Sequence, residues 1–206
     1  MMGIETSGSL NLLFTDKTGT LTKGKLEVIR FITPSLKEYD SIDELKNNKP
    51  LYNLVTKSFC LNNESVYSDN KIVGGNITDR ALLKFVGKNI EGKVVDRVLF
   101  SSKNKYSKVV LEDGYRLMKG AYEVLLPNCN YYYDDLGNRK YFVGKNKVER
   151  KIEDISKRGI RVIAFVVAYK NEVYGLLGFA YLKDEIRQEA IKGIELVKNA
   201  GIDTIM

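Results

Sequence analysis

The chain has 206 residues, of which 44% are hydrophobic and 29% are charged, and its 33 Lys and Arg against 26 Asp and Glu give a formal net charge of +7. This length suffices for one large hydrophobic core or two modest domains. The sequence has no histidine, which excludes the most common general base and metal ligand.

Several classes of protein fit the sequence poorly. No run approaches the roughly 18 to 20 apolar residues that cross a bilayer, and the best candidate, Val162–Tyr169, has the length of a strand. The first residues lack the basic region and apolar core of a signal peptide, so we expect the chain taken alone to be soluble. Cys60 and Cys129 form no metal or redox motif, as in a reducing cytosol. Basic residues are scattered among acidic ones without a nucleic-acid-binding signature, so no nucleic-acid partner is expected.

The first predicted element is a short buried strand of a parallel sheet, Leu10–Phe14, which is apolar without helical spacing. Asp16 stands at its exit, and ligands of open α/β sheets bind outside the carboxyl ends of the strands. Gly19 suits a tight turn, and Lys17 adds a positive charge. Hydroxyl groups that could cradle phosphate oxygens follow at alternate positions, Thr18, Thr20 and Thr22. Asp16 is therefore a candidate nucleophile toward a phosphoryl group, although an ordinary strand and polar turn would have the same composition.

The residues Asp16–Thr22 read Asp-Lys-Thr-Gly-Thr-Leu-Thr, which resembles the signature of the P-type ATPases. The resemblance implies that ATP phosphorylates Asp16 during ion transport, that Mg²⁺ and Lys17 offset the charge, and that Asp16 and Thr18 form part of the magnesium site. Because a pump needs membrane helices, it also implies that the chain is a cytoplasmic piece of a longer protein. The later Thr-Gly-Asp and Gly-Asp-Gly loops of the family are absent from the sequence.

The next segments change from strand to helix. Leu26–Ile32 alternates loosely, as a strand does, and the polar stretch 35–50 is predicted to lie on the surface with a capped helical turn at Ser41–Leu45. Apolar residues near helical spacing predict a helix over Leu51–Leu61 with one buried face.

A second helix is predicted to begin at Thr78 as its N-cap. Calcium-transporting pumps carry a Thr-Glu-x-Ala-Leu element at this place, whose acid contacts the adenine amino group. Asp79 occupies the position of that acid and is one methylene shorter. The resemblance therefore implies a nucleotide contact, and the alternative is an acid in the first turn that interacts with the helix dipole.

Three antiparallel strands are predicted next, Val98–Ser102, Tyr106–Leu111 and Arg116–Met118. The first turn resembles the Phe-Ser-x-x-x-Lys stretch of the P-type nucleotide domain. By that resemblance Phe100 stacks on adenine and Lys105 reaches toward the nucleotide, whereas the residues alone allow Phe100 to be a core aromatic.

The run Lys119–Glu123 resembles the family motif Lys-Gly-Ala-Pro-Glu, with Tyr122 in place of the proline. Gly120 would let the backbone approach a flat base, and the ammonium group of Lys119 would border the pocket. The alternative is an ordinary surface turn.

After these motifs, the sequence predicts a hairpin tip at Tyr131–Asp135 and an amphipathic helix over Lys140–Arg158. A buried strand, Ile160–Tyr169, and its hairpin partner, Asn171–Leu182, are predicted to follow. By resemblance, Arg161 approaches the ATP phosphates. The alternative is an arginine in solvent at a strand end.

The segment Lys183–Arg187 resembles the Asp-Pro-x-Arg hinge through which the family returns to the phosphorylation domain, although both prolines are missing. Asp184 and Arg187 match the charged residues of the hinge. Asp184 equally suits the N-cap of a final helix that stops at Gly201. The inward face predicted for that helix consists of Ile186, Ala190, Ile194 and Val197.

Together the motifs predict an α+β nucleotide-binding domain over residues 26–182, an antiparallel sheet with packed helices. It would be inserted into an incomplete α/β phosphorylation domain of the haloacid-dehalogenase type, formed by residues 1–25 and 183–206. In a type II, calcium-pump-like transporter, this portion would face the cytoplasm and deliver ATP. Its partners would be the transported cation and the membrane and actuator domains of the same polypeptide.

Two rival functions stay open. Soluble phosphatases of the haloacid-dehalogenase class share the strand-end aspartate, but they typically place a second Asp two positions later, where this chain has Thr18. A chain that binds nucleotide without turning it over is the other rival.

Overall fold

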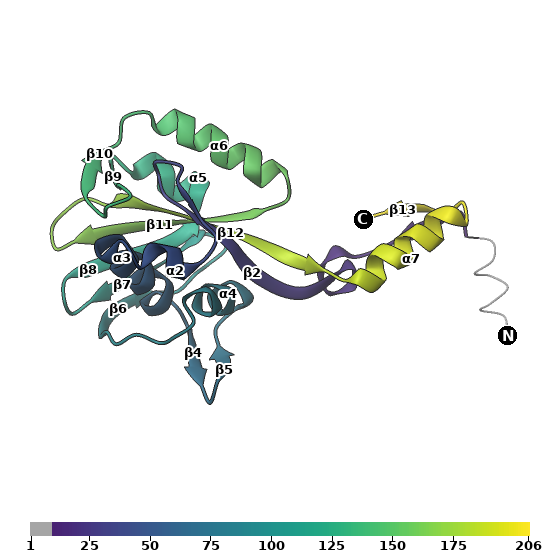
Figure 1. Cartoon of the computed structure of the whole chain (residues 1–206), viewed down its shortest axis with the longest axis horizontal. Helices are drawn as coiled ribbons and strands as arrows, with labels where there is room; N and C mark the ends of the chain where they lie inside the picture. Colours follow the sequence, from purple (N-terminus) through teal and green to yellow (C-terminus); the bar gives the residue numbers. More distant parts are fainter. Residues whose placement is uncertain (1–9) are drawn as a thin grey trace. The chain divides into compact units, whose positions relative to one another are not determined.

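The computed structural model describes residues 10–206, apart from the side chain of Thr18, and these residues divide into two compact units (Figure 1). Unit 1 combines the described residues up to Leu26 with Asp184–Met206, and unit 2 is Glu27–Lys183. The strands β2 (Thr22–Ile32) and β12 (Gly175–Ile186) contribute residues to both units, so the chain enters and leaves unit 2 along strands. The predicted segment 1–25 thus includes nine residues outside the described part of the chain.

Unit 2 is built on one large sheet with the strand order β10-β9-β12-β11-β8-β7-β6, and β2 pairs with both β12 and β3. Neighbouring strands from β6 to β12 along this order pair antiparallel, whereas β9 and β12 pair in parallel. The remaining strands of the sheet are β3 (Glu38–Tyr39), β6 (Val94–Val98), β7 (Tyr106–Leu111), β8 (Tyr115–Ala121), β9 (Tyr131–Tyr133), β10 (Arg139–Tyr141) and β11 (Arg161–Tyr169). A separate hairpin consists of β4 (Ser65–Ser68) and β5 (Lys71–Gly74). The predicted antiparallel sheet is confirmed.

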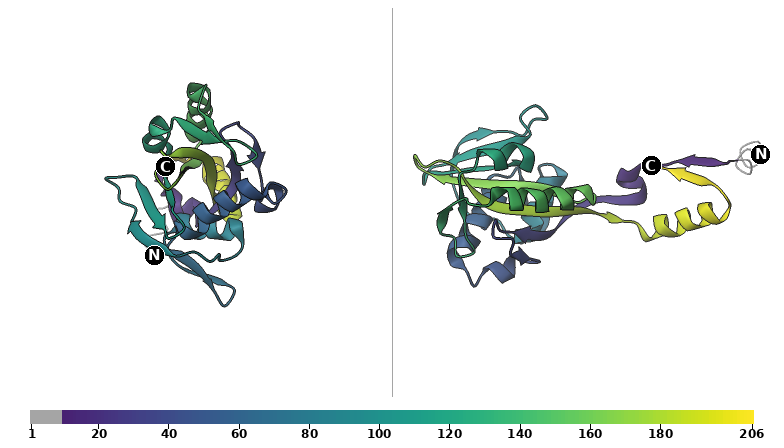
Figure 2. Two further views of the ribbon diagram at one scale, coloured as in Figure 1. Left: turned by 90° about the vertical axis from the view of Figure 1, so that its left-hand side faces the viewer. Right: turned by 90° about the horizontal axis from the view of Figure 1, so that it is seen from above.

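Helices cover both faces of this sheet (Figures 1 and 2). They are α2 (Ile42–Leu45), α3 (Lys49–Leu61), α4 (Ile77–Val86), α5 (Tyr122–Leu125) and α6 (Lys145–Lys157), with a 3₁₀ turn, η2 (Leu126–Asn128), after α5. Successive residues of a strand point to opposite faces of the sheet, so the side chains of β11 pack into a hydrophobic core on each face. Phe165 packs on Phe59 of α3 with ring centroids 4.5 Å apart, whereas Ala164 shares a core cluster with Val148 and Ile152 of α6.

Two predicted element boundaries near the motifs are wrong. Helix α4 begins at Ile77 with Asn76 as its N-cap, because the Asn76 side chain accepts a hydrogen bond from the Asp79 N–H at 3.0 Å, so Thr78 lies inside the first turn. Strand β6 ends at Val98, before Phe100, since the chain then turns back and the Lys105 N–H donates to the Ser101 carbonyl at 2.7 Å.

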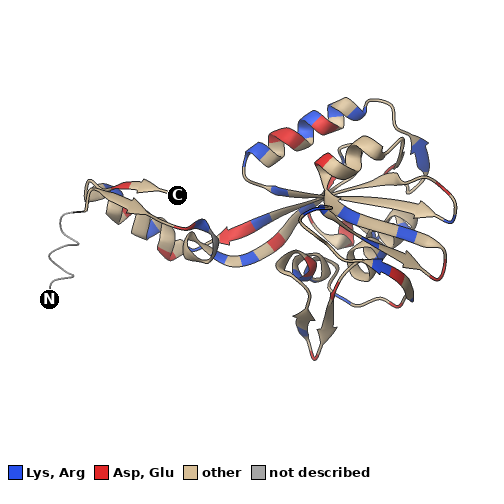
Figure 3. Ribbon diagram, turned by 180° about the vertical axis from the view of Figure 1, so that it is seen from behind, with Lys and Arg blue, Asp and Glu red and all other residues tan. Residues whose placement is uncertain are grey.

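The predicted helix over 140–158 is five residues too long at its start. Residues Arg139–Tyr141 pair with Tyr131–Tyr133 as the hairpin β9–β10, so the tyrosine run is a strand and its turn follows it. Gly144 takes a left-handed conformation (φ 81°) that ends this segment before α6 begins. The alternating basic and acidic residues of α6 are visible in Figure 3.

Unit 1 contains β1 (Leu12–Phe14), a π-helical turn η1 (Lys17–Leu21), α7 (Gln188–Asn199) and β13 (Asp203–Ile205). The predicted parallel pairing is present, since β1 pairs in parallel with β13. The prediction that this strand is buried is wrong, because Phe14 is 72% exposed. Two strands and one helix are too few to cover both faces of a parallel pair.

Helix α7 also differs from its prediction. Asp184 and Ile186 belong to strand β12, and the helix begins after Arg187, so Asp184 is not its N-cap. The described helix has no buried residue, although Ala190, Ile194 and Val197 are half-buried on its predicted inner face. Among the described residues, none of the helices combines the length and apolar character needed to cross a membrane.

Candidate functional site

Unit 2 contains a cavity of about 590 Å³ bordered by the start of α4, the end of β8 and the start of β11. We call it the Lys119 cavity. Its volume lies within the range of small-molecule sites. Every residue that the sequence predicted as a nucleotide contact lines it: Asp79, Phe100, Lys105, Lys119, Gly120 and Arg161. The fold therefore gathers four motifs that are far apart in the sequence.

Phe100 and Lys105 reach the Lys119 cavity from the two ends of one tight turn. The turn is closed by the bond from the Lys105 N–H to Ser101, and the Lys105 carbonyl accepts from the Ala121 N–H at 2.9 Å. Phe100 is 55% exposed, so it is not the core aromatic that the sequence alone allowed. Its ring is available to a ligand.

Gly120 is fixed by backbone packing. A Cβ atom there would lie 2.4 Å from the Lys105 carbonyl oxygen and 2.6 Å from the Cβ of Tyr106. The close approach that needs glycine is therefore between β8 and the turn that carries Lys105. This contact sets the position of Phe100 and Lys105 relative to Lys119.

Lys119 and Asp79 form a buried ion pair that contributes to the lining of the cavity. The Lys119 ammonium group donates to Asp79 Oδ1 and to the Asn62 carbonyl, and only 7% of Lys119 and 2% of Asp79 are exposed. Burial lowers the pKa of Lys119, while the neighbouring Asp79 carboxylate opposes this shift. Lys119 is thus not on a surface turn.

The second oxygen of Asp79 is also occupied. Oδ2 accepts from the Asn76 side-chain amide and from the Glu64 N–H, both at 3.3 Å. Asp79 is therefore a buried acceptor for several donors, and it also lies in the first turn of α4, where the alternative interpretation placed it. Its spare capacity toward a ligand is small.

Sequence reasoning missed the two asparagines that hold this arrangement together. The Asn62 side chain donates to the carbonyls of Ser107 and Leu117, at 3.3 and 3.4 Å, and so joins the end of α3 to β7 and β8. The Asn63 side chain donates to the Asp79 carbonyl at 2.8 Å. In the sequence they are two polar residues after a helix, a composition typical of any loop.

Two exposed cations, Lys105 and Arg161, lie on the same cavity. Arg161 Nη1 lies 3.5 Å from the hydroxyl of Thr78 in the first turn of α4, so the positive end of that helix adds to this side. Arg161 is exposed at a strand end, and it lines the cavity as well. Apolar surface comes from Ile77, Val162 and Ile163.

Unit 1 carries the predicted catalytic residues. Asp16, Lys17 and Thr20 are exposed on and beside the π-helical turn, and the side chain of Thr18 lies outside what the structure describes. Gly19 takes a left-handed conformation (φ 85°), in agreement with its predicted place in a turn. The carboxylate of Asp16 is thus open to solvent within its unit.

The predicted hinge residues, Asp184 on β12 and Arg187 directly after it, contact this turn. The Thr22 hydroxyl donates to Asp184 Oδ2 at 2.6 Å. Arg187 donates through Nε to the Thr22 carbonyl at 3.0 Å and through Nη2 to the Gly19 carbonyl at 3.2 Å. The two ends of unit 1 are therefore joined at the turn that follows Asp16.

A magnesium site is not assembled by these residues alone. Within the described part of the chain, no three His, Cys, Asp or Glu side chains cluster as metal ligands. Mg²⁺ prefers octahedral oxygen ligands and usually keeps several waters beside one or two carboxylates. Asp16 could supply one such carboxylate.

The comparison with known families decides the identity. The model of the P-type ATPase cytoplasmic domain N matches residues 50–194, which is more than half of the chain and includes the whole lining of the Lys119 cavity. The chain belongs to the P-type ATPases. The match confirms the family predicted from the sequence, and the large antiparallel sheet of unit 2 fits a P-type ATPase domain N.

Several P-type ATPase relatives align with nearly the whole chain. It is 30% identical over 233 residues to the calcium-transporting ATPase PAT1 of Dictyostelium discoideum, and this alignment covers 96% of the chain and 20% of the relative. It is 29% identical over 228 residues to calcium-transporting ATPase 1 of Bacillus cereus, covering 98% and 25%. It is 30% identical over 237 residues to the plasma membrane-type calcium-transporting ATPase 7 of Oryza sativa, covering 96% and 22%. The chain thus spans a fifth to a quarter of these relatives.

Proposed function

We propose that unit 2 binds ATP in the Lys119 cavity and that, within a longer P-type ATPase, the γ-phosphoryl group is transferred to Asp16 to drive cation transport across a membrane. The observation that carries the proposal is the convergence of all six predicted nucleotide residues on one cavity within the matched domain N. The relatives named as calcium-transporting ATPases support a cation, calcium in the first instance, as the cargo.

The cavity chemistry suits the two ends of ATP. The exposed ring of Phe100 and the apolar side chains Ile77 and Val162 offer a face for the base. The exposed ammonium and guanidinium groups of Lys105 and Arg161 offer charge for the phosphates. Lys119 and Asp79 fix the shape of the site through their ion pair, and a ligand that approaches them meets a lysine already paired.

At the phosphoryl-transfer step, a carboxylate oxygen of Asp16 attacks the γ-phosphorus. The bond between that phosphorus and the β–γ bridging oxygen breaks, and ADP leaves. Lys17 offsets negative charge beside the attacking oxygen. Bound Mg²⁺ would supply charge neutralisation of the phosphates, with Asp16 and Thr18 as its ligands from this chain.

We also propose that unit 1 is part of a phosphorylation domain of the haloacid-dehalogenase type, into which unit 2 is inserted. The parallel pair β1–β13, the exposed Phe14 on it, and the exit of β1 at Asp16 support this assignment. The membrane and actuator domains of the same polypeptide would complete the pump, with the present units facing the cytoplasm.

ATP binding is tested by isothermal titration calorimetry of the chain, with folding checked by circular dichroism. Phe100→Ala should weaken ATP binding about tenfold or more, because base stacking is lost. The matched control Val95→Ala removes a side chain of similar exposure, 56%, from β6 and should leave the affinity unchanged. Lys105→Gln should weaken binding through the phosphates, whereas Lys103→Gln, in the same turn but outside the cavity lining, should not. A folded chain without ATP affinity would refute the assignment.

Phosphoryl transfer is tested in the longer protein. Incubation with γ-labelled ATP and an acid quench should leave label that hydroxylamine removes and that Asp16→Asn abolishes. Rapid hydrolysis of 4-nitrophenyl phosphate by the chain itself, lost in Asp16→Asn, would instead favour the phosphatase function.

A further inference from the structure

A second cavity, of about 650 Å³, lies in unit 2 at the other end of strands β8 and β11. Tyr115 and Tyr169 line it, whereas Gly120 and Arg161, near the opposite ends of the same strands, line the Lys119 cavity. A strand rises about 3.3 Å per residue, which separates the two sets by about 17 to 26 Å. None of the described residues lines both cavities. We call the second one the tyrosine cavity.

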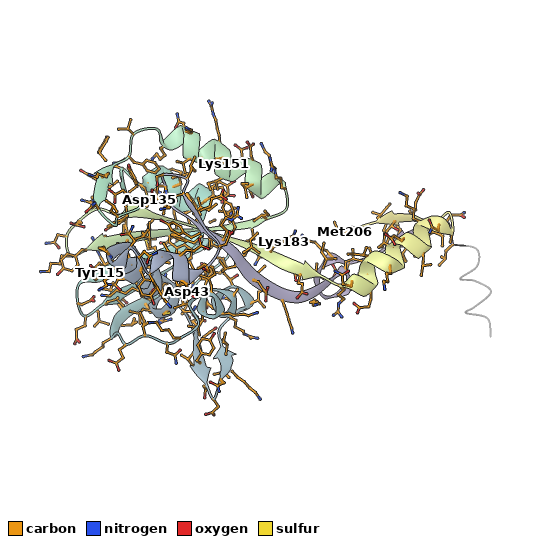
Figure 4. All side chains as sticks on the ribbon, viewed as in Figure 1. Asp43, Tyr115, Asp135, Lys151, Lys183 and Met206 are labelled. Carbon is orange, nitrogen blue, oxygen red and sulfur yellow. The ribbon has the colours of Figure 1, made fainter. Side chains whose placement is uncertain are left out.

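Contacts within the protein itself hold the walls of the tyrosine cavity in place. One wall is the face of α3 that carries Leu54 and Lys57, and another is the turn of the β9–β10 hairpin. The hairpin is tied down by Asp135, whose Oδ1 accepts from the hydroxyls of Thr33 and Ser35, both at 2.6 Å. Tyr115 and Asp135 are both labelled in Figure 4. The cavity is therefore preformed.

Aromatic rings make up much of its surface. The rings of Tyr115 and Tyr169 contact each other with centroids 4.9 Å apart, and Tyr169 is 36% exposed. Tyr133 completes the group and is almost fully buried. Burial raises its pKa to about 12. The rings offer flat faces to a flat ligand.

Two cations accompany these rings. The Lys57 ammonium lies 4.2 Å from the centroid of Tyr115, and the Arg139 guanidinium stacks 3.9 Å from the centroid of Tyr131. Glu172 is the one acidic residue of the described lining, and the Lys57 ammonium is also paired with Asp113, which lies outside the lining. An anion in the cavity would therefore rely on the N–H donors of Arg139 and on those that Lys57 keeps beside its bond to Asp113.

Arg139 is held in place with donors to spare. Its Nη2 donates to the Val173 carbonyl at 2.9 Å, and its Nε lies 3.9 Å from Glu172 Oε2, beyond hydrogen-bond distance. A guanidinium group has five N–H donors. An incoming carboxylate or phosphate would find an oriented, partly unsatisfied partner.

We propose that the tyrosine cavity is a second ligand site of this chain, for a small molecule that joins a flat ring to a phosphate or carboxylate group. The ring lies against Tyr115 and Tyr169, and the anionic group lies between Lys57 and Arg139. The site is independent of the Lys119 cavity and of any activity at Asp16.

The test is a titration of the ¹⁵N-labelled chain with phenyl phosphate, followed by two-dimensional NMR. Amides of Tyr115, Asn138, Arg139 and Lys170 should shift saturably, and should do so equally when ATP is present. Inorganic phosphate and benzyl alcohol, which each carry one half of the chemistry, should bind about tenfold more weakly or worse, since each loses at least one interaction worth about 1.4 kcal/mol. Shifts confined to Gly120 and Ala121, or equal affinity for benzyl alcohol, would overturn the proposal.

Variants separate the site from the general stability of this end of the sheet. Tyr169→Ala and Lys57→Gln should each weaken phenyl phosphate binding at least about fivefold while the spectrum stays that of a folded chain. Lys140→Gln is the matched control, because Lys140 is an exposed cation beside Arg139 on β10 that does not line the cavity. An effect of the control as large as that of Lys57→Gln would show non-specific charge attraction and overturn the assignment.

Discussion

Lys119 on β8 and Asp79 on α4 form an ion pair across 40 positions of sequence, and both side chains are almost completely buried. The pair joins two motifs that the sequence presents as separate ligand contacts. Its partners include the Asn62 carbonyl and the Asn76 amide, so the cavity surface at this point is a polar network inside the protein. Such a network stabilises one arrangement only if every member has a partner.

The first prediction concerns this pair. Lys119→Met or Asp79→Asn alone should lower the free energy of unfolding by about 3 to 5 kcal/mol, because each leaves a buried partner without its counter-charge. The double variant should recover a large part of the loss. The measurement is urea unfolding of all three variants in a double-mutant cycle.

The exposed pair Lys93–Glu112 provides the control, since these side chains are 71% and 61% exposed. Lys93→Met should change stability by no more than about 0.5 kcal/mol. If Lys119→Met cost no more than Lys93→Met, the buried pair would not support the cavity as we infer.

A second prediction concerns Gly120. Gly120→Ala should destabilise unit 2 by about 1 to 3 kcal/mol, because the new Cβ overlaps the Lys105 carbonyl. It should also weaken ATP binding by displacing the turn that carries Phe100. Gly193→Ala is the same substitution in α7, where nothing lies within 4 Å of the new Cβ, and it should stabilise that helix by about 0.5 to 1 kcal/mol. Thermal unfolding and calorimetry with ATP measure both effects, and unchanged behaviour of Gly120→Ala would contradict the steric argument.

The sequence predicted the existence of several elements correctly but not their boundaries. Strands such as β7 and β11 and the helix α3 follow from local periodicity, so their existence was predictable. The boundaries of α4 and β6 were not, because they depend on the Asn76 side chain and on the bond from Lys105 to Ser101. The hydrophobic periodicity of a sequence does not predict such single hydrogen bonds.

The candidate site shows the same division. Motif order located the residues of the Lys119 cavity, but the Asp79–Lys119 pair and the tyrosine cavity arise from tertiary packing. The tyrosine run at 131–133 was expected at a hairpin tip, and the structure makes it the strand before that tip. The exposure of Phe14 was unpredictable for another reason, since an apolar strand pattern does not say how many neighbours cover it.

A third prediction concerns the contact between Thr22 and Asp184. Thr22→Val keeps the shape of a side chain that is 3% exposed but removes the hydroxyl that donates to Asp184. Asp184 Oδ1 is already buried without a partner among the described residues, so the carboxylate would lose its remaining hydrogen bond. We expect a loss of about 1 to 3 kcal/mol in the local stability of unit 1.

Amide hydrogen exchange at Gly19, Thr22 and Arg187 reads this local stability directly. Thr20→Val, at an exposed position of the same turn, is the control and should leave the exchange rates near those of the parent chain. Equal protection in Thr22→Val and the parent would exclude a role for the hydroxyl in holding the turn beside Asp16.

The last prediction is a pH dependence centred on Cys129. Burial raises the pKa of this thiol from an ordinary value of 9.0 to about 12. The folded chain therefore holds a proton that the unfolded chain releases above about pH 9, so stability is fully present below that pH and falls as the pH rises toward 12. The slope from one such group is at most about 1.4 kcal/mol per pH unit.

Under reducing conditions, urea unfolding of the parent chain at pH 8, 9 and 10 should show a free energy of unfolding that falls more steeply as the pH rises. Cys129→Ala should lose about 1 kcal/mol at pH 8 through a small cavity but should decline less with pH, whereas Asn130→Ala, at an exposed position nearby, should keep the parental slope. A parental slope in Cys129→Ala would assign the alkaline loss to other groups.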